Sequence, residues 1–303
     1  MRKYLIILML FISHLGISQN CKHPDEWGNY ELNKVSWSPG LFNISHPIED
    51  TIRVKVKVHV IYPRKSSDYI TNEQIYSQII ATNKHFSKAK IKLVLLKINH
   101  LYIEEENYKR FGITENNELI IKSATIDYDC YNIWLVSEID SNDGGLNRQA
   151  YAYYPGASRV IDGMVVLQNA FGTTKDVKFY VNQGKVTTHE FGHAFGLLHT
   201  FEGDKGGTEC PEDGGCGLGY GDCCDDTPSH IRNQEICDFN QENCYGENLD
   251  NVMMNFMNYT EQSCQSMFTL EQIYIMRNVV LQLRSNIIAD STDKSIIPIE
   301  KKN

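Results

Sequence analysis

The feature that most constrains this chain is the stretch T-H-E-F-G-H-A-F-G-L-L-H-T-F at residues 188–201. If its first half is helical, His189 and His193 stand at positions i and i+4 on one face, where two imidazoles can bind one tetrahedral metal ion. Gly196 tolerates a positive φ, so the helix can end there and the chain can bring His199 back as a third ligand. Three protein ligands leave one position for water, as in catalytic zinc sites.

Glu190 adjoins His189 and would therefore lie beside whatever the metal binds. Single histidines are most often ordinary surface or core residues, and His-Glu-x-x-His alone arises by chance in helices. The addition of Gly196 and His199 at fixed spacing makes a chance match rare, on the order of one in 10^4 for a chain of this length. We therefore predict a metal site formed by His189, His193 and His199.

Length and charge narrow the remaining possibilities. The chain has 303 residues, enough for one large domain or two lobes around a cleft, and 42% of them are hydrophobic, which supports a substantial core. The net charge of −9 and the absence of a sustained basic run argue weakly against nucleic acid as a partner.

The N-terminus has the pattern of a secretory signal peptide. Arg2 and Lys3 precede an apolar run at residues 4–12, which is too short to span a bilayer. A small-x-small pattern at residues 16–18 predicts cleavage after residue 18, so we expect residues 1–18 to be removed and the protein to be secreted, extracellular or periplasmic. A membrane anchor is the alternative; once the signal is removed we expect no membrane association.

Patterns of apolar residues predict a sheet combined with helices. Between residues 52 and 60 every second residue is Ile or Val, which predicts a half-buried strand. Thr71 and Thr269 each open a capping box, so a helix is expected after each. Similar patterns predict strands over 91–98, 131–137, 149–154 and 162–168, and helices over 72–87, through the histidine stretch to Ala194 or Phe195, and from 269 to about 287. This order predicts an α+β fold with a twisted, mixed sheet.

Three segments carry more specific expectations. We expect 162–168 to be an edge strand that receives an extended peptide by strand addition, with an interior strand as the alternative. Residues 202–251 are rich in Gly, Asp, Glu and Cys and predict an irregular region held by disulfides. Residues 290–303 predict a polar, loose tail.

The cysteines favour disulfides. Seven of the nine lie between Cys210 and Cys264, and exported proteins with clustered cysteines are usually cross-linked. The odd number leaves at least one thiol without a partner in the chain. A structural zinc cluster is the alternative, but the spacing does not match a zinc-finger pattern.

Several blocks of sequence together carry a resemblance to a known family. They are H-E-F-G-H-A-F-G-L-L-H-T-F at 189–201, G-D-C-C-D-D-T-P at 221–228, N-F-M-N-Y-T at 255–260, F-T-L-E-Q at 268–272, and D-G-M-V-V-L at 162–167 followed by Phe171-Gly172. In this combination, over roughly residues 51–285, the chain resembles the pappalysins of the cytophagalysin type, a branch of the metzincin zinc metallopeptidases.

The resemblance implies a secreted zinc endopeptidase that cleaves extended protein or peptide substrates. The three histidines would bind one zinc ion, and Glu190 would act as general base and then as general acid. Met257 resembles the methionine of the Met-turn beneath the histidines, and Tyr259 the tyrosine that approaches the metal or stabilises the oxyanion. The alternatives are an ordinary core methionine and a structural tyrosine. Two rival functions are a binding protein that has lost hydrolysis, against which Glu190 argues, and a cysteine-rich structural module.

The resemblance also implies a domain organisation. We expect a prosegment at 19–50, with an irregular N-terminal arm as the alternative. An N-terminal catalytic subdomain at 51–199 would end in the zinc helix, a C-terminal subdomain at 200–289 would carry the Met-turn, and a tail would follow at 290–303. The C-terminal lobe should be irregular, stapled by disulfides and closed by a helix. The sequence predicts no oligomeric state.

Calcium is a further expectation. The Asp222, Asp225 and Asp226 carboxylates and the Thr227 carbonyl offer several oxygens in a Gly-rich loop, which suits Ca²⁺, and the resemblance implies structural calcium nearby. A solvated acidic loop without an ion is the alternative.

The family's usual disulfides correspond to Cys210 with Cys244 and Cys237 with Cys264. Cys223 and Cys224 stand where the family usually has other residues. They could form a further disulfide with Cys216 or Cys130, and this pairing remains open.

Cys21 follows the expected cleavage site, and the resemblance implies that it is a zinc ligand of a latent form. An incidental cysteine is the alternative. Residues that follow the Met-turn shape the pocket just beyond the cleaved bond in metzincins, which here points to Glu261 and Gln262. An acidic wall from Glu261 would favour Arg or Lys there, and Gln262 would give a more neutral pocket; both remain open.

Overall fold

The structure, a computed structural model, describes most of the chain after residue 50. The described residues are 48, 50–63, 70–103, 116–139, 148–212, 214–232 and 237–298. The expected signal peptide and Cys21 lie outside them, and so does the expected prosegment except for residues 48 and 50.

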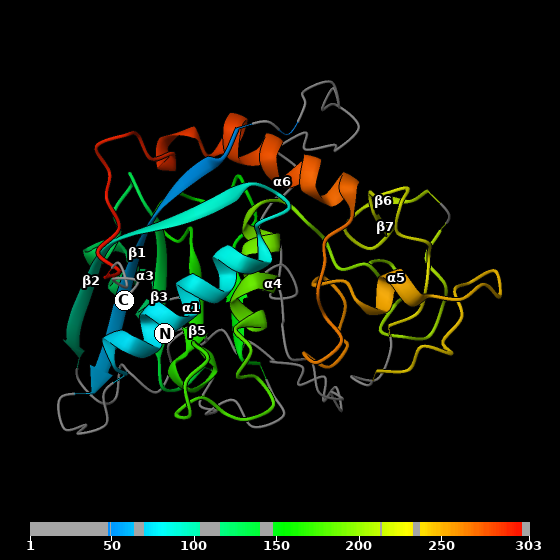
Figure 1. Cartoon of the computed structure of the whole chain (residues 1–303), viewed down its shortest axis with the longest axis horizontal. Coiled ribbons are helices and arrows are strands. Elements are labelled where there is room, and N and C mark those ends of the chain that lie inside the picture. The colour runs from blue at the N-terminus through cyan, green and yellow to red at the C-terminus, as the bar shows by residue number, and fades with distance from the viewer. Residues whose placement is uncertain are drawn as a thin grey trace, which may run out of the picture.

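A five-stranded mixed sheet forms one side of the described region, at the left in Figure 1, with strand order β2-β1-β3-β5-β4. β2, β1, β3 and β5 run parallel, and β4 is antiparallel to β5. The strands are β1 Ile52–Pro63, β2 Ile91–Ile103, β3 Tyr131–Val136, β4 Ala150–Ala152 and β5 Met164–Leu167. The α+β fold with a mixed sheet is confirmed.

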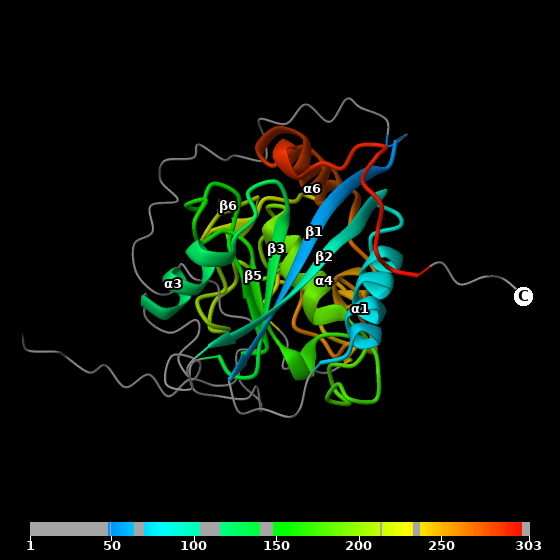
Figure 2. The same cartoon turned by 90° about the vertical axis from the view of Figure 1, so that its left-hand side faces the viewer.

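Helices cover both faces of this sheet. α1 (Asn72–His85) and α4 (Lys185–Ala194) pack together on one face. α3 (Asn116–Thr125) covers the other, where the Trp134 indole donates a hydrogen bond to the Thr125 hydroxyl (2.9 Å). Figure 2 shows α1 and α3 on opposite sides of the strands. Parallel sheets are buried in this way because the chain that crosses between their strands packs on their faces.

The C-terminal part of the chain is irregular apart from one long helix. α6 (Leu270–Leu283) runs across the top in Figure 1, and its Thr269 cap forms both hydrogen bonds of the expected capping box. The Phe86 ring contacts those of Phe191, Phe195 and Phe268, which joins α1, α4 and the start of α6. The short elements are η4 Gln168–Ala170, β6 Cys216–Gly217, β7 Gly221–Asp222, α5 Asp250–Met253 and η5 Ser285–Ile287.

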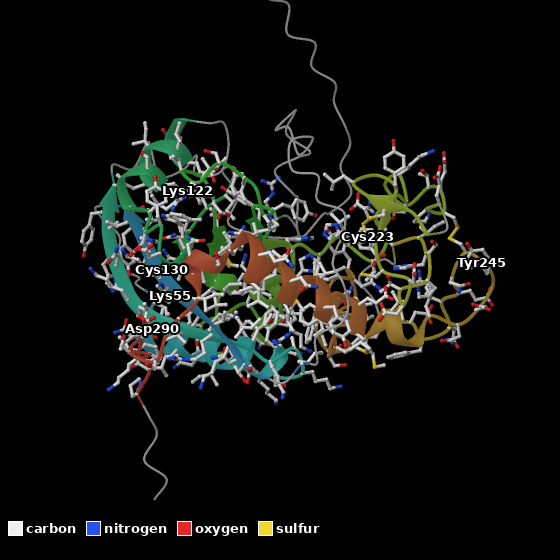
Figure 3. The ribbon with its side chains drawn as sticks, turned by 90° about the horizontal axis from the view of Figure 1, so that it is seen from above. Lys55, Lys122, Cys130, Cys223, Tyr245 and Asp290 are labelled. Atoms are coloured by element: carbon white, nitrogen blue, oxygen red, sulfur yellow. A yellow bond between two sulfur atoms is a disulfide. The ribbon has the colours of Figure 1, made fainter. Side chains whose placement is uncertain are left out.

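Three disulfides cross-link this irregular part. They join Cys210 to Cys244, Cys216 to Cys223 and Cys237 to Cys264, while Cys130 and Cys224 are free and buried. Both expected family pairs are therefore confirmed, and Cys223 takes Cys216, one of its two open partners. Viewed from above, Cys223 and Tyr245 lie at one end of the molecule, and Lys122 and Cys130 lie at the sheet end (Figure 3).

The expectation of an edge strand at 162–168 is wrong. β5, inside the segment 162–168, lies between β3 and β4, so the edge strand is β4. The reason is visible in the four residues of β5, Met164–Leu167, which are all apolar and all buried, as in an interior strand. The described part of the tail is mostly exposed but touches the sheet: the Ile296 amide donates to the Leu95 carbonyl (2.9 Å), and Ile297 packs against the core. That the tail is loose stays a prediction.

His59 makes the fold sensitive to acid. Its ring is fully buried, stacks on Trp134 with centroids 5.1 Å apart and hydrogen-bonds Asn132 (2.9 Å). Burial lowers the pKa of His59 from 6.5 to about 4. The unfolded chain therefore binds a proton more readily, so the contribution of His59 is complete above about pH 6.5 and is lost as the pH falls through 4.

We expect this histidine to reduce the free energy of unfolding by about 3 kcal/mol between pH 6.5 and pH 4. His59→Gln should lower stability at pH 7, because it loses the stacked ring, and should flatten this part of the pH dependence. Urea unfolding at pH 7, 5.5 and 4.5 measures both effects. A variant that keeps the parent's slope would show that His59 does not cause it.

Candidate metal centre

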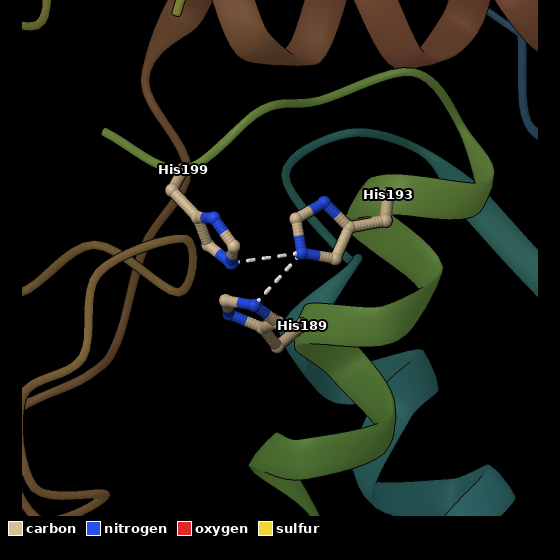
Figure 4. Close-up of side chains that lie close together, drawn as sticks. All are labelled: His189, His193 and His199. Carbon is tan, nitrogen blue, oxygen red and sulfur yellow. Dashed lines mark hydrogen bonds between the residues drawn. The ribbon is translucent and has the colours of Figure 1, made fainter. Parts of the chain in front are cut away.

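α4 positions two histidines, and the turn after it brings in the third. His189 and His193 lie one turn apart, and the helix ends at Ala194, as expected. Gly196 then has φ of +94°. In this conformation the chain folds back and places His199 opposite the other two rings (Figure 4).

The three imidazoles converge through their Nε2 atoms. His193 Nε2 lies 3.0 Å from His189 Nε2 and 3.1 Å from His199 Nε2. The Nδ1 atoms of His189 and His193 face the carbonyl oxygens of Phe256 (2.7 Å) and Leu197 (2.8 Å). A carbonyl only accepts hydrogen bonds, so each Nδ1 carries the proton and each Nε2 presents a lone pair.

Lone pairs this close repel each other unless a cation lies between them. Tetrahedral zinc with Zn–N bonds of about 2.0–2.1 Å would separate its nitrogen ligands by about 3.3 Å, close to the spacing observed. The three residues are the one all-histidine group within metal-binding reach in the described part of the chain. Burial lowers the pKa of His189 to about 4, against the opposing effect of its bond to Phe256. The ring is therefore neutral at pH 7, which is the form that binds metal.

The Met-turn supports the histidines from below. Met257 is fully buried, and its thioether fills the space where a Cβ on Gly192 of α4 would lie. Asn255 fixes the turn, because its side chain accepts from the Met257 amide (2.8 Å) and donates to Gln272 on α6 (2.8 Å). Met257 therefore packs under the helix and is not a ligand. Sequence reasoning identified Met257 but missed Gly192, whose only sequence signal is a glycine inside a helix.

Glu190 and Tyr259 also lie in this region. Glu190, next to His189, is 1% exposed. The half-buried Tyr259 ring lies 4.8 Å from the His199 ring and 5.9 Å from the His189 ring, so the structure brings the tyrosine to the ligands. Sequence reasoning missed Phe201, whose ring stacks on His199 (4.9 Å) and contacts Tyr259 (4.7 Å).

The four residues considered for calcium hold a loop against α6. The buried Asp222 carboxylate accepts hydrogen bonds from the Thr227 hydroxyl and the Cys224 amide, and burial raises its pKa to about 8. The Asp226 carboxylate accepts from the Glu271 amide (3.0 Å), and the Asp225 amide donates to the Glu271 carboxylate. These contacts give structural partners to the Asp222 and Asp226 carboxylates, whereas Asp225 is exposed and contributes its backbone amide. The calcium site stays a prediction.

Of the two residues considered for the specificity pocket, Gln262 contacts the start of α4, whereas Glu261 contacts Ser263. Glu261 is exposed and accepts from the Ser263 hydroxyl (3.1 Å). The Gln262 side chain accepts from the Gln183 amide (3.1 Å), and its carbonyl accepts from Lys185, the first residue of α4. Separately, none of the helices in the described ranges is long and apolar enough to span a membrane.

Curated relatives are similar over most of the chain. An extracellular metalloprotease of Pyricularia oryzae is 26% identical over 245 residues, and one of Colletotrichum graminicola is 27% identical over 245 residues; each match covers 78% of either chain.

Solved structures share the fold. Mature mirolysin of Tannerella forsythia in complex with a cleaved peptide has a TM-score of 0.63 at 24% identity, over 79% of this chain and 96% of that one. A promirolysin mutant has a TM-score of 0.60 at 24% identity, over 78% and 84%. The family model described as pregnancy-associated plasma protein-A, peptidase M43, matches residues 114–281, more than half of the sequence. The chain therefore belongs to this family, the pappalysins, and is a metallopeptidase.

Proposed function

We propose that the protein is a secreted zinc endopeptidase that cleaves extended peptide segments at the three-histidine centre. The observation that carries the proposal is the convergence of three Nε2 atoms, 3.0 and 3.1 Å apart, with two of the Nδ1 protons held by backbone carbonyls. Three converging imidazole nitrogens, with two of the rings oriented by hydrogen bonds to carbonyls, make the donor set of a catalytic zinc site.

Each nearby side chain then has a role in peptide hydrolysis. The three histidines would hold the zinc ion, which would supply an acidified water and Lewis-acid polarisation of the scissile carbonyl. Glu190 accepts the proton of the attacking water and later donates it to the leaving amine. The Tyr259 phenol donates a hydrogen bond to the carbonyl oxygen as that oxygen becomes negative. The carbonyls of Phe256 and Leu197 keep His189 and His193 in the tautomer that binds metal.

The organisation of the chain belongs to the same proposal. The N-terminal subdomain, 51–199, carries the helix with the first two ligands, and the C-terminal subdomain, 200–289, carries the Met-turn; the substrate lies between them. Curated relatives of this chain are named extracellular metalloproteases, which supports secretion after removal of residues 1–18. Latency through Cys21 and structural calcium remain predictions.

Metal removal tests this proposal. We expect about one zinc ion per chain, and cleavage of a mixed peptide library that falls at least a hundredfold on treatment with 1,10-phenanthroline and returns when zinc is restored. Mass spectrometry of the library gives the cleaved bonds. Zinc without cleavage in the chain freed of residues 1–50 would favour a binding protein. A folded, zinc-supplied chain without bound metal would favour a structural module.

A further inference from the structure

A cavity of about 460 Å³ lies between the end of α1, the start of α4 and the segment that joins the Met-turn to α6. Three lysines line it: Lys84 and Lys88 are exposed at its rim, and Lys185 is only 8% exposed. None of the described residues that line it carries a carboxylate. Three positively charged side chains therefore surround one cavity, although the chain as a whole has a net charge of −9.

The field inside the cavity is positive. Burial, and then the neighbouring Lys84, lower the pKa of Lys185. The pKa of His85, which also lines the cavity, falls to about 4, first through burial and then through Lys185 and Lys84. His85 is therefore neutral at pH 7, and the lysines supply the charge. The positive end of the α4 dipole, at Lys185, adds to it. An anion that entered would be attracted from several sides.

The cavity lies one helical turn from the metal ligands. Lys185, His189 and His193 follow each other at intervals of four residues on α4, so Lys185 stands on the ligand face about 6 Å along the axis from His189.

Contacts of His85 connect the wall of the cavity to His189. His85 Nδ1 lies 2.7 Å from the Thr188 hydroxyl, and its ring lies 5.0 Å from that of Phe256. The Phe256 carbonyl in turn accepts from His189. The cavity is therefore a neighbour of the metal centre rather than a remote surface feature.

We propose that this cavity is the subsite for an acidic substrate side chain, one or two residues from the cleaved bond. This inference rests on the proposed function, because it assumes that a peptide lies across the histidines. An extended peptide advances about 3.3 Å per residue, so if it ran along α4 past His189, a side chain one or two residues from the cleaved bond would reach Lys185. A carboxylate there meets ammonium groups in a partly buried setting, where such a pair is stronger than on the open surface.

The residues after the Met-turn agree with this charge. Glu261 is bonded to Ser263 and does not line the cavity, so the cavity has no acidic wall from that residue. Gln262 lies beside it instead, with its carbonyl accepting from Lys185. The sequence left open a pocket for Arg or Lys and a neutral pocket. The lysines around the cavity disfavour the first, and they favour an acidic substrate side chain over a neutral one.

The test compares peptides that differ at one position only. Sets with Glu, Gln or Lys at each of the two positions on either side of the cleaved bond are assayed with the zinc-loaded chain at low salt. We expect kcat/KM for Glu to exceed that for Lys about tenfold or more at one position, mainly through KM, and the preference to shrink at higher salt.

Variants of the lining lysines test whether the cavity is the source of the preference for Glu. Lys185→Gln should reduce the Glu-to-Gln ratio. Because Lys185 also holds Gln262, the double variant K84E/K88E, at two exposed positions, is the second test and should reverse the ratio of Glu to Lys. Lys92→Glu, exposed on β2 outside the cavity, is the matched control and should leave every ratio unchanged.

Equal cleavage of the three peptides at every position, or a preference for Lys, overturns this subsite while the proposed function stands. An acidic preference that survives K84E/K88E and Lys185→Gln also overturns it, because the preference then arises elsewhere. If the zinc-loaded chain freed of residues 1–50 cleaves none of the peptides, and none of a mixed library, the proposed function itself fails.

Discussion

Glu190→Gln is expected to lower kcat for peptide cleavage about 10^3-fold or more while the chain keeps one zinc ion. Gln has nearly the same shape as Glu, so the buried position, 1% exposed, can hold it without a cavity. Its amide cannot accept the proton of the attacking water or return it to the leaving amine. The proposed ligands are the three histidines, two of which are held by the carbonyls of Phe256 and Leu197, so we expect metal binding not to need the carboxylate.

Two measurements on the same preparation decide this prediction. Zinc per chain is determined by elemental analysis, and kcat and KM are measured with one peptide. Glu73→Gln, an exposed residue in the first turn of α1, is the matched control and should behave as the parent. A Glu190→Gln protein that holds zinc and stays within tenfold of the parent would mean that another group accepts the proton. Loss of zinc in the variant would instead give Glu190 a structural role.

Local chemistry explains what the sequence could predict of this site. The spacing of His189, His193 and His199 is set by one helix and one glycine turn, so the pattern alone fixed which rings meet. The capping box at Thr269 is equally local, and both of its hydrogen bonds form.

The groups that orient the histidines could not be predicted from the sequence. His189 is oriented by the Phe256 carbonyl, 67 residues away, and every residue has a carbonyl whatever its side chain. Lys185 meets Gln262, 77 residues away, for the same reason. Such contacts depend on how the Met-turn packs under Gly192. The spacing of apolar residues in the sequence does not predict that packing.

Strand order was the other limit. The apolar run of β5 identified a strand, but its neighbours depend on pairing between distant segments. β4 has only three residues, Ala150–Ala152, and is too short for a clear alternation. The sequence therefore did not predict that β4 pairs with β5. Because β4 pairs antiparallel with β5, β5 is an interior strand and β4 is the edge strand next to it.

Arg284→Met is expected to lower the free energy of unfolding by about 3 kcal/mol. Arg284, at the end of α6, is 5% exposed, and three separate segments between residues 153 and 194 share its guanidinium. Its Nε donates to the Ala194 carbonyl at the end of α4 (2.8 Å), and its Nη2 donates to Asp162 (2.9 Å) and to the Tyr153 carbonyl (3.3 Å). Nη1 also contacts Asp162, so the pair is bidentate.

The size of the effect follows from what the methionine leaves behind. Met fills most of the volume but leaves the Ala194 carbonyl without its donor and the Asp162 carboxylate without its counter-ion. That carboxylate is 28% exposed, so water relieves part of the penalty, and we expect the lower end of the range of 3–5 kcal/mol for a broken buried pair. Arg277→Met, also on α6 but half-buried and bonded to the Ala89 carbonyl, should cost about 1 kcal/mol and is the control.

A double variant separates the ion pair from packing. If the unpaired carboxylate causes the loss, Arg284→Met combined with Asp162→Asn should be more stable than Arg284→Met alone, because the carboxylate that lost its arginine is no longer charged. Urea unfolding of the zinc-loaded proteins at pH 7 measures each free energy. Equal stability of the single and double variants would assign the loss to the Ala194 and Tyr153 carbonyls. In that case Arg284 would act by closing the end of α4, next to the turn that brings His199 to the metal centre.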